Sequence, residues 1–329
     1  MKFGLFFVNT GMGSTAAGAK DVATRGEALG FESLWTVEHV VVPSGYESKY
    51  PYDPSGKMAG GAEAFDLPDP LAWLAFVAAV TDRIKLATGI LILPQRNPAI
   101  TAKEVATIDS LSGGRVILGL GVGWLREEFD ALGVPFEDRG RRHDDYVEAM
   151  RALWKGDKAT VHNTYANFDN CISLPRPANG TVPLVIGGHT KRAAQRAARL
   201  GDGFFPGSGG IDELQVLFDA MRAECDVIGR DPSEIELSPE AAAEPSTRSA
   251  PGWKRYRRSA SRACSCRHCP ATGSTEWPRP CATASGWTPD RNPGHPLCRG
   301  RFVMTKRRPA EGRNGAGRGP TLMHCPQPL

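Results

Sequence analysis

A short apolar run that ends in closely spaced glycines constrains this fold more than any other segment. Polar and apolar residues do not alternate in residues 115–120, and Gly119, Gly121 and Gly123 lie at the end of the run. Such a run is typical of a strand buried on both faces of a parallel sheet. The glycines let the main chain turn sharply, with no Cβ in the way of a flat ring or a sugar phosphate. In parallel barrels, this end of a strand is where the chemistry takes place.

Short apolar runs alternate with amphipathic segments from residue 2 to about residue 240, which indicates repeated βα units and a parallel sheet. The predicted strands are 3–8, 33–37, 84–91, 116–120, 184–186, 203–205 and 235–237. The predicted helices are 16–29, 70–80, 99–110, 141–154, 191–200 and 212–228. This pattern predicts an α/β fold, a TIM-like (β/α)8 barrel that lacks its last βα unit. Two insertions, 40–69 and 159–177, are expected to be lids or substrate walls.

Charge and composition change sharply near residue 240. Residues 1–240 hold 24 Lys and Arg against 32 Asp and Glu, a net charge of −8, whereas residues 241–329 hold 16 against 4, a net charge of +12. The second segment has no Ile and one Val but twelve Pro and fourteen Arg, so it lacks the apolar surface needed to offset its ordering entropy. We therefore expect a barrel domain over 1–240 and a disordered Arg/Pro/Cys-rich tail over 241–329. The composition of the tail resembles that of a GC-rich gene translated in the wrong reading frame, which suggests a frameshift near residue 240.

Cysteine usage and the first residues indicate a reducing compartment. Six of the eight cysteines follow residue 260, so no disulfide scaffold is expected in the barrel domain. Residues 1–8 are apolar for only a short distance and lack a small-residue cleavage site, which predicts a strand rather than a signal peptide. No apolar run approaches membrane-spanning length. We expect a cytoplasmic protein that makes no membrane contact.

The tail allows two further interpretations. Thiolates and imidazoles suit zinc, but the spacing of Cys264, Cys266 and Cys269 is not that of a standard zinc finger, and few apolar residues remain to pack around an ion. We therefore expect no metal site. Arginine richness favours nonspecific contact with polyanions, whereas the sparse aromatic residues argue against specific recognition of nucleic acid.

A glycine pair ahead of a basic helix predicts an anion site. Gly187 and Gly188 precede Thr190, whose hydroxyl is placed to cap a helix that begins at Lys191. Free N–H groups and the positive end of the helix dipole attract anions at such a position. An ordinary turn before a capped helix is the alternative, and turn chemistry alone leaves both open.

Several motifs together resemble the bacterial luciferase-like superfamily, most closely its deazaflavin-dependent branch, whose members use coenzyme F420. They cover about three quarters of the chain and occur in order: Trp35-Thr-Val-Glu-His39, Leu93-Pro-Gln-Arg-Asn-Pro98, Gly114 to Phe129, Arg139, Glu148 to Trp154 and Gly201-Asp-Gly-Phe204. The resemblance implies a barrel of the luciferase-like type that binds a flavin or deazaflavin at the carboxyl ends of its strands. It also implies hydride transfer between coenzyme F420 and a small organic substrate.

The resemblance implies roles for particular residues. His39, at the end of the second strand, would lie near the reactive ring carbon and steer charge as hydride moves, although a histidine that closes a strand can equally be a structural residue. Gly89 and Ile90 would form a cis peptide behind the ring. The other residues implied to bind the coenzyme are Gly121, Val122, Gly123 and Trp124 at the ring or its ribityl chain, and Gly187, Gly188, His189 and Thr190 at its phosphate.

The chain departs from that branch after the glycine turn. Some members carry a carboxylate there, where this chain has Trp124, so we expect no acid role for the later Glu127 and Glu128. The insertion 40–69 holds only two lysines, which argues against a highly charged substrate. Aromatic residues in and near it favour an apolar or aromatic one: Trp35, Tyr46, Tyr50, Tyr52 and Phe65.

Two other functions stay open at this point. An FMN-dependent monooxygenase that activates dioxygen would share nearly every motif. Without a last βα unit, the first and seventh strands would be open edges, so the chain could also be an inactive barrel remnant whose basic tail contacts polyanions. For an active enzyme the expected partner is a small-molecule substrate and, if the chain self-associates, a second copy in a homodimer.

Overall fold

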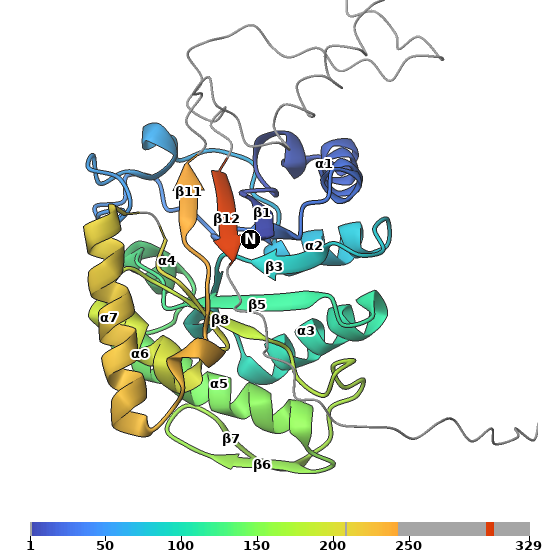
Figure 1. Cartoon of the computed structure of the whole chain (residues 1–329), viewed down its shortest axis with the longest axis vertical. Coiled ribbons are helices and arrows are strands. Elements are labelled where there is room, and N and C mark those ends of the chain that lie inside the picture. Colours follow the sequence, from blue (N-terminus) through green and yellow to red (C-terminus); the bar gives the residue numbers. More distant parts are fainter. Residues whose placement is uncertain (1, 208, 243–300, 306–329) are drawn as a thin grey trace, which may run out of the picture.

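A curved, mostly parallel sheet forms the centre of the protein, and helices pack outside it (Figure 1). The computed structural model describes residues 2–207, 209–242 and 301–305. Its strands are β1 (Lys2–Phe6), β2 (Ser33–Thr36), β3 (Lys85–Thr88), β4 (Leu91–Ile92), β5 (Val116–Gly121), β6 (Ala159–His162), β7 (Asn167–Cys171), β8 (Leu184–Gly187), β9 (Gly203–Phe205), β10 (Glu236–Leu237), β11 (Glu240–Ala242) and β12 (Arg301–Thr305).

Four of the α-helices in the described part of the chain begin at a side-chain cap. The α-helices are α1 (Ala16–Ala28), α2 (Pro70–Ala78), α3 (Pro98–Ser112), α4 (Arg126–Ala131), α5 (Arg139–Lys155), α6 (Lys191–Leu200) and α7 (Ile211–Ile228). Short 3-10 turns are η1 (Gly11–Ser14), η2 (Met58–Gly61), η3 (Leu93–Gln95) and η4 (Pro232–Glu234). Asp69 and Asn97 accept hydrogen bonds from the first turns of α2 and α3, and each helix has proline at its start. All the predicted helices are present; α4 was not predicted.

The parallel part of the sheet has the order β10-β9-β8-β5-β3-β2-β1, which brings every predicted strand into one ladder. Leu34 lies beside Leu86 between β2 and β3, and Leu120 lies beside Ile186 between β5 and β8. The predicted strand 84–91 is interrupted after β3, at the cis peptide bond between Gly89 and Ile90. The chain resumes as β4, which pairs with the end of β5. The predicted TIM-like barrel lacking its last unit is therefore confirmed.

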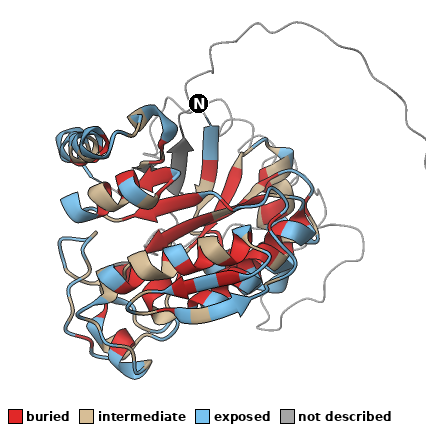
Figure 2. Cartoon of the chain, turned by 90° about the horizontal axis from the view of Figure 1, so that it is seen from below, coloured by how far each residue is buried: buried red, intermediate tan, exposed pale blue. Residues whose placement is uncertain are grey.

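Two apolar layers hold the sheet. The inner face gathers Trp35, Ala87, Val185 and Phe205 from four strands, with the Trp35 and Phe205 rings stacked at 5.9 Å. The outer face packs against the buried sides of the helices, and Figure 2 shows this burial concentrated on the strands. Barrels of this kind fill their interior with side chains, so the open space for a ligand lies at the ends of the strands.

The edge of β1 is covered by a strand from the far end of the chain. β12 pairs antiparallel with β1, with Val303 opposite Gly4, and pairs with β11 on its other side (Figure 1). The expectation that β1 would be an open edge is therefore wrong. The expectation of a tail without strands is also wrong for the residues that form β11 and β12. An exposed edge offers unpaired N–H and C=O groups that any extended segment can satisfy, whatever its composition.

The remaining predictions for the tail lie outside the described residues. These are the disorder expected within 243–300 and 306–329, the cysteines weighed for zinc and most of the arginines weighed for polyanion contact.

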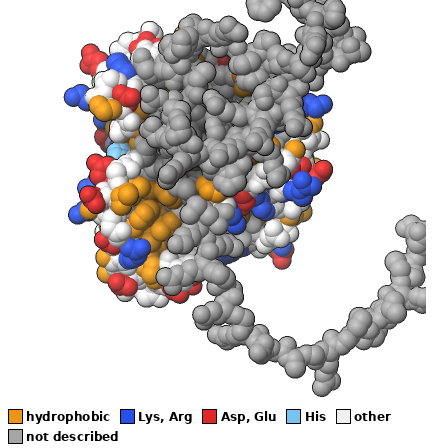
Figure 3. Space-filling view, turned by 45° about the horizontal axis from the view of Figure 1, so that its top comes forward, with side chains coloured by type: hydrophobic (Ala, Val, Ile, Leu, Met, Phe, Trp, Pro, Cys, Tyr) orange, Lys and Arg blue, Asp and Glu red, His pale blue; other side chains and the backbone are white. Residues whose placement is uncertain are grey.

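On the described atoms of the face in Figure 3, acidic and basic side chains are interspersed around an apolar group. None of the helices in the described part of the chain is long and apolar enough to cross a membrane.

Candidate functional site

Three strand ends meet around the side chain of Ile90. A Cβ added to Gly121, at the end of β5, would lie 2.5 Å from Cδ1 of Ile90, and one added to Gly187, at the end of β8, would lie 2.4 Å from its Cγ2. Glycine is required at both positions for Ile90 to occupy this place. Gly89 packs beneath, against Phe6 and Trp35 of the inner layer. The structure therefore brings together the predicted coenzyme residues from β3, β5 and β8, with half-buried Ile90 as an apolar surface among them.

An arc of ring contacts connects the end of β2 with the end of β8. The His39 ring meets Trp124 edge to face at 5.8 Å, and Trp124 lies 5.2 Å from Tyr50. Tyr50 lies 5.4 Å from Tyr52, which in turn lies 4.9 Å from His189. The insertion 40–69 thus places two tyrosines between two predicted site histidines. Val122 and Gly123 lead the chain from β5 into this arc, and Arg139 Nε donates to the Gly123 carbonyl at 3.1 Å.

His39 is paired with a carboxylate from α4. Its Nδ1 lies 2.9 Å from Oε2 of Glu128, while Oε1 of Glu128 accepts from the backbone N–H of Val40 at 2.6 Å and of Val41 at 3.4 Å. The Glu128 side chain is only 1% exposed, and that of His39 is 12% exposed. The expectation for Glu128 concerned an acid role only; the contact that the sequence did not reveal is the one this carboxylate makes with the predicted catalytic histidine.

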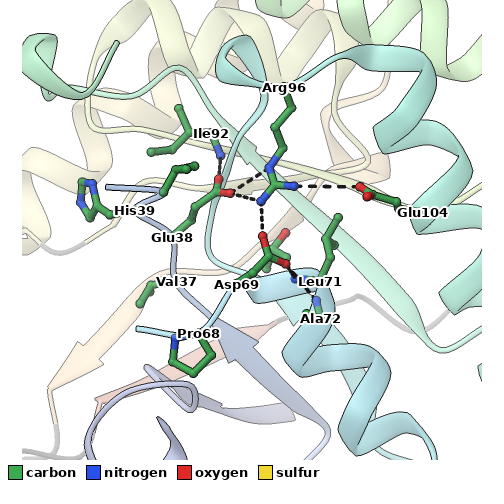
Figure 4. A network of polar contacts seen from close by, with 12 residues as sticks. Val37, Glu38, His39, Pro68, Asp69, Leu71, Ala72, Ile92, Arg96 and Glu104 are labelled. Carbon is green, nitrogen blue, oxygen red and sulfur yellow. Dashed lines mark hydrogen bonds and ion pairs between the residues drawn. The ribbon is translucent and has the colours of Figure 1, made fainter. Parts of the chain in front are cut away.

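An ion-pair network around the buried carboxylate of Glu38 fixes the backbone next to His39 (Figure 4). Glu38 accepts from Arg96 Nε at 2.8 Å and from the N–H of Ile92, and Arg96 also donates to Asp69 at 2.5 Å. Burial raises the pKa of Glu38 above its ordinary value, against the opposing effect of Arg96. Burial disfavours the charged form of Arg96, but its carboxylate partners outweigh this and raise its pKa. Two sequence motifs, residues 35–39 and 93–98, are therefore joined by the pair of Glu38 and Arg96.

A cavity of about 310 Å³ opens beside His39. Its lining residues are Glu38, His39, Val40, Leu67, Asp69, Pro70, Gln95, Arg96 and Leu132. The volume lies at the lower end of the range for small-molecule sites. Because Glu38 and Asp69 are both paired with Arg96, the cavity presents paired charges and apolar walls, and His39 belongs both to its lining and to the ring arc.

The predicted anion site is formed in part. Thr190 caps α6, since its Oγ1 accepts from the N–H of Ala193 at 3.2 Å, as expected. The N–H of Gly188, expected to be free, instead donates to the carbonyl of Phe205 at 3.0 Å, because the pairing of β8 with β9 continues past Gly187. The positive end of α6 and exposed Lys191 remain available to an anion.

Two of the expected substrate-wall aromatics belong to the core. Trp35 is 1% exposed in the inner layer, with its Nε1–H donated to Ser33 at 2.8 Å. Tyr46 is 2% exposed, and its hydroxyl accepts from the N–H of Met58 at 3.1 Å. These side chains cannot contact a substrate, whereas Tyr50 and Tyr52 lie in the ring arc.

These residues fit a ringed coenzyme that carries a phosphate. Glycines at the strand ends surround the apolar side chain of Ile90, and His39 and its neighbouring aromatic rings lie beside it. The positive dipole end at the start of α6 can bind an anion. Ring and phosphate would then be held at separate strand ends, as a molecule of that shape requires.

Comparison with known proteins identifies the family. The family model described as luciferase-like monooxygenase matches residues 1–267, so the chain belongs to this family of oxidoreductases and monooxygenases. An uncharacterized protein of Mycobacterium tuberculosis is 33% identical over 217 residues, which cover 66% of this chain and 74% of that protein. The FMNH(2)-dependent dimethylsulfone monooxygenase of Pseudomonas fluorescens is 27% identical over 208 residues, 62% of this chain and 52% of that enzyme. The chain thus matches about half the length of the latter.

A solved structure supports the same fold. An F420-dependent secondary alcohol dehydrogenase in complex with an F420-acetone adduct superposes with a TM-score of 0.59 at 23% identity. The superposition covers 72% of this chain and 68% of that one. At this identity the likeness establishes the barrel architecture alone, in agreement with the strand order described above.

Proposed function

We propose that this protein is an oxidoreductase that transfers hydride between coenzyme F420 and a small, mainly apolar organic substrate. The observation that carries the proposal is the pairing of His39 with Glu128 at the strand ends, beside an apolar surface and a small cavity. The coenzyme supplies the hydride chemistry when it is bound, and the protein supplies orientation and proton handling. The motif resemblance to the deazaflavin branch favours F420 over FMN.

The proposed roles divide the site between three groups. Ile90 and the glycine turn 121–123 support the ring, while the start of α6 with Gly188, His189 and Thr190 holds the phosphate. His39 faces the reacting centre and handles the proton that balances the hydride. The substrate occupies the cavity next to His39, where its small volume and paired charges favour a small uncharged molecule.

A second candidate is an FMN-dependent monooxygenase on the same barrel. The likeness to the dimethylsulfone monooxygenase favours it, since that relative uses FMNH(2). Ring, ribityl chain and phosphate would occupy the same strand ends in either case, so the two proposals differ in the coenzyme and in the use of dioxygen.

Titration of the purified full-length chain with F420 and, separately, with FMN tests the proposal. We expect quenching of F420 fluorescence that saturates at micromolar concentration or below, and binding of FMN at least tenfold weaker. His39→Ala should keep F420 binding but lower the hydride-transfer rate by about 100-fold or more, the usual contribution of a positioned acid or base. Tighter binding of FMN than of F420 would reject the proposal in favour of the monooxygenase.

A further inference from the structure

We propose that Glu128 is a positioning residue that keeps the proton of neutral His39 on Nδ1 and thereby makes Nε2 the proton-exchanging atom of the site. The inference rests on the proposed function, in which His39 faces the reacting centre. It assigns a role to a carboxylate that comes from α4, a separate element, and that lies 89 residues from the histidine in sequence.

The hydrogen-bond pattern around Glu128 determines where the proton lies. Its Oε1 is occupied by the N–H of Val40 at 2.6 Å, and Val41 points a second N–H at the same atom at 3.4 Å. Its Oε2 faces His39 Nδ1 at 2.9 Å. A carboxylate oxygen can only accept hydrogen bonds, so the ring must supply the proton of this contact from Nδ1.

No other charged group in the described part of the chain is seen to contact the imidazole. Glu38, the preceding residue, points away from the His39 ring in Figure 4 and is bound to Arg96. Asp69, on the wall of the same cavity, is also bound to Arg96. The ring also meets the indole of Trp124 edge to face. The orientation of His39 is therefore set by Glu128 and by the indole.

The consequence for proton transfer is specific. When the ring is an imidazolium, Nε2 gives up its proton while the other proton stays on Nδ1, hydrogen-bonded to Glu128, and the neutral ring left behind takes a proton back at Nε2. In a reduction, the bound coenzyme would supply the hydride and His39 Nε2 would supply the proton. In the reverse direction Nε2 accepts the proton as the hydride leaves the substrate.

The tautomer of His39 can be measured without any coenzyme. In full-length protein labelled with 15N-histidine, the nitrogen shifts and two-bond proton couplings of a neutral imidazole distinguish Nδ1–H from Nε2–H, and His39→Asn assigns the signal. We expect Nδ1–H in the native protein. In Glu128→Gln, the single amide oxygen is needed by the N–H of Val40, so the amide NH2 faces Nδ1 and donates to it. That arrangement reverses the tautomer to Nε2–H.

The control is Glu137→Gln, which removes a carboxyl whose side chain is 66% exposed in a surface ion pair. It should leave the tautomer as Nδ1–H. A native protein with Nε2–H, or a Glu128→Gln protein that keeps Nδ1–H, overturns the proposal. The native measurement requires no variant and is decisive even if Glu128→Gln fails to fold.

Rates then connect the tautomer with function. Glu128→Gln should lower hydride transfer by about 10- to 100-fold, a loss typical when the partner of a functional histidine is removed. The pH profile should also change, whereas KM should not. An unchanged rate and profile in a variant with the reversed tautomer would reject the catalytic consequence. Failure of both coenzymes to bind would reject the proposed function and leave the tautomer result standing.

Discussion

At the scale of single residues, three glutamates near the strand ends have different roles because their carboxylates have different neighbours. Glu38 is buried against Arg96 and fixes the backbone, and Glu128 is buried against His39. Glu127 is half-buried and accepts from the N–H groups of Glu47 and Ser48 at 2.8 and 3.0 Å, which attaches the insertion 40–69 to α4. Both neighbours therefore bind the insertion 40–69, and only Glu128 also contacts His39.

Glu127 predicts a pH dependence of stability. Although its partial burial acts in the opposite direction, hydrogen bonds from Ser48 and from backbone N–H groups lower the pKa of Glu127 from 4.5 to about 2. A carboxyl with a lowered pKa in the folded state stabilises the fold above pH 4.5, and this contribution is lost as the pH falls toward 2. Glu127→Gln should lower the free energy of unfolding by about 1 kcal/mol at pH 6 and by less at pH 3. This value allows for screening by solvent, because the carboxylate is only half-buried.

Thermal melting of native and variant protein between pH 6 and pH 3 measures this difference. Asp66→Asn, which removes an exposed carboxylate from the same insertion, is the control and should lower the melting temperature little at any pH. A Glu127→Gln deficit that stays constant across the range would contradict the prediction.

The sequence could indicate single residues where the signal is local or where a family motif carries it. The cap at Thr190 follows from its place before a helix, and the cis peptide at Gly89 follows from the resemblance; both are confirmed. The partners of Glu128 and Glu38 lie 89 and 58 residues away, so no local pattern reveals these contacts. The burial of Tyr46 was missed for the same reason, because its hydroxyl finds its partner only in the folded loop.

At the scale of elements, boundaries were predictable where a cap or an apolar run marks them. The six predicted helices begin and end within two residues of their observed bounds. The short α4 (Arg126–Ala131) was missed because it has six residues and no side-chain cap. The β6–β7 hairpin lies in the insertion 159–177, which was expected only to be a lid or substrate wall; β6 alternates between buried and exposed residues, but the mostly exposed β7 does not.

The start of α6 provides a test at this scale. Thr190→Ala removes the hydroxyl that accepts from Ala193, so we expect the free energy of unfolding to fall by about 1 kcal/mol. Thr190→Ser keeps an acceptor at the same place and should lose much less. Urea unfolding followed by circular dichroism measures both variants. Equal losses in the two would show that the methyl group, and not the cap, stabilises this end of the helix.

At the scale of the whole molecule, the sheet depends on contact between the two ends of the described chain. Seven strands follow one another in parallel, and β12 then lies antiparallel between β1 and β11. The overall composition after residue 240 concealed this strand, although residues 301–305 include Phe302, Val303 and Thr305, which are residue types that favour strands. This pairing covers the edge of the sheet, so β1 is not exposed as it would be in a barrel remnant.

Val303→Pro tests that pairing in the full-length chain. Val303 is paired with Gly4 of β1 and with Glu240 of β11, so its N–H points to one of these two strands, and proline removes that donor and also clashes in a central strand. We expect the free energy of unfolding to fall by about 1–3 kcal/mol and the amides of β1 to exchange at least tenfold faster. Val303→Thr keeps the N–H and a branched side chain, so its exchange should stay near native. Hydrogen exchange with mass spectrometry over residues 2–6 distinguishes the outcomes. Native-like protection of β1 in the proline variant would mean that β12 does not stabilise this edge, and the chain would then need another way to shield β1 from association.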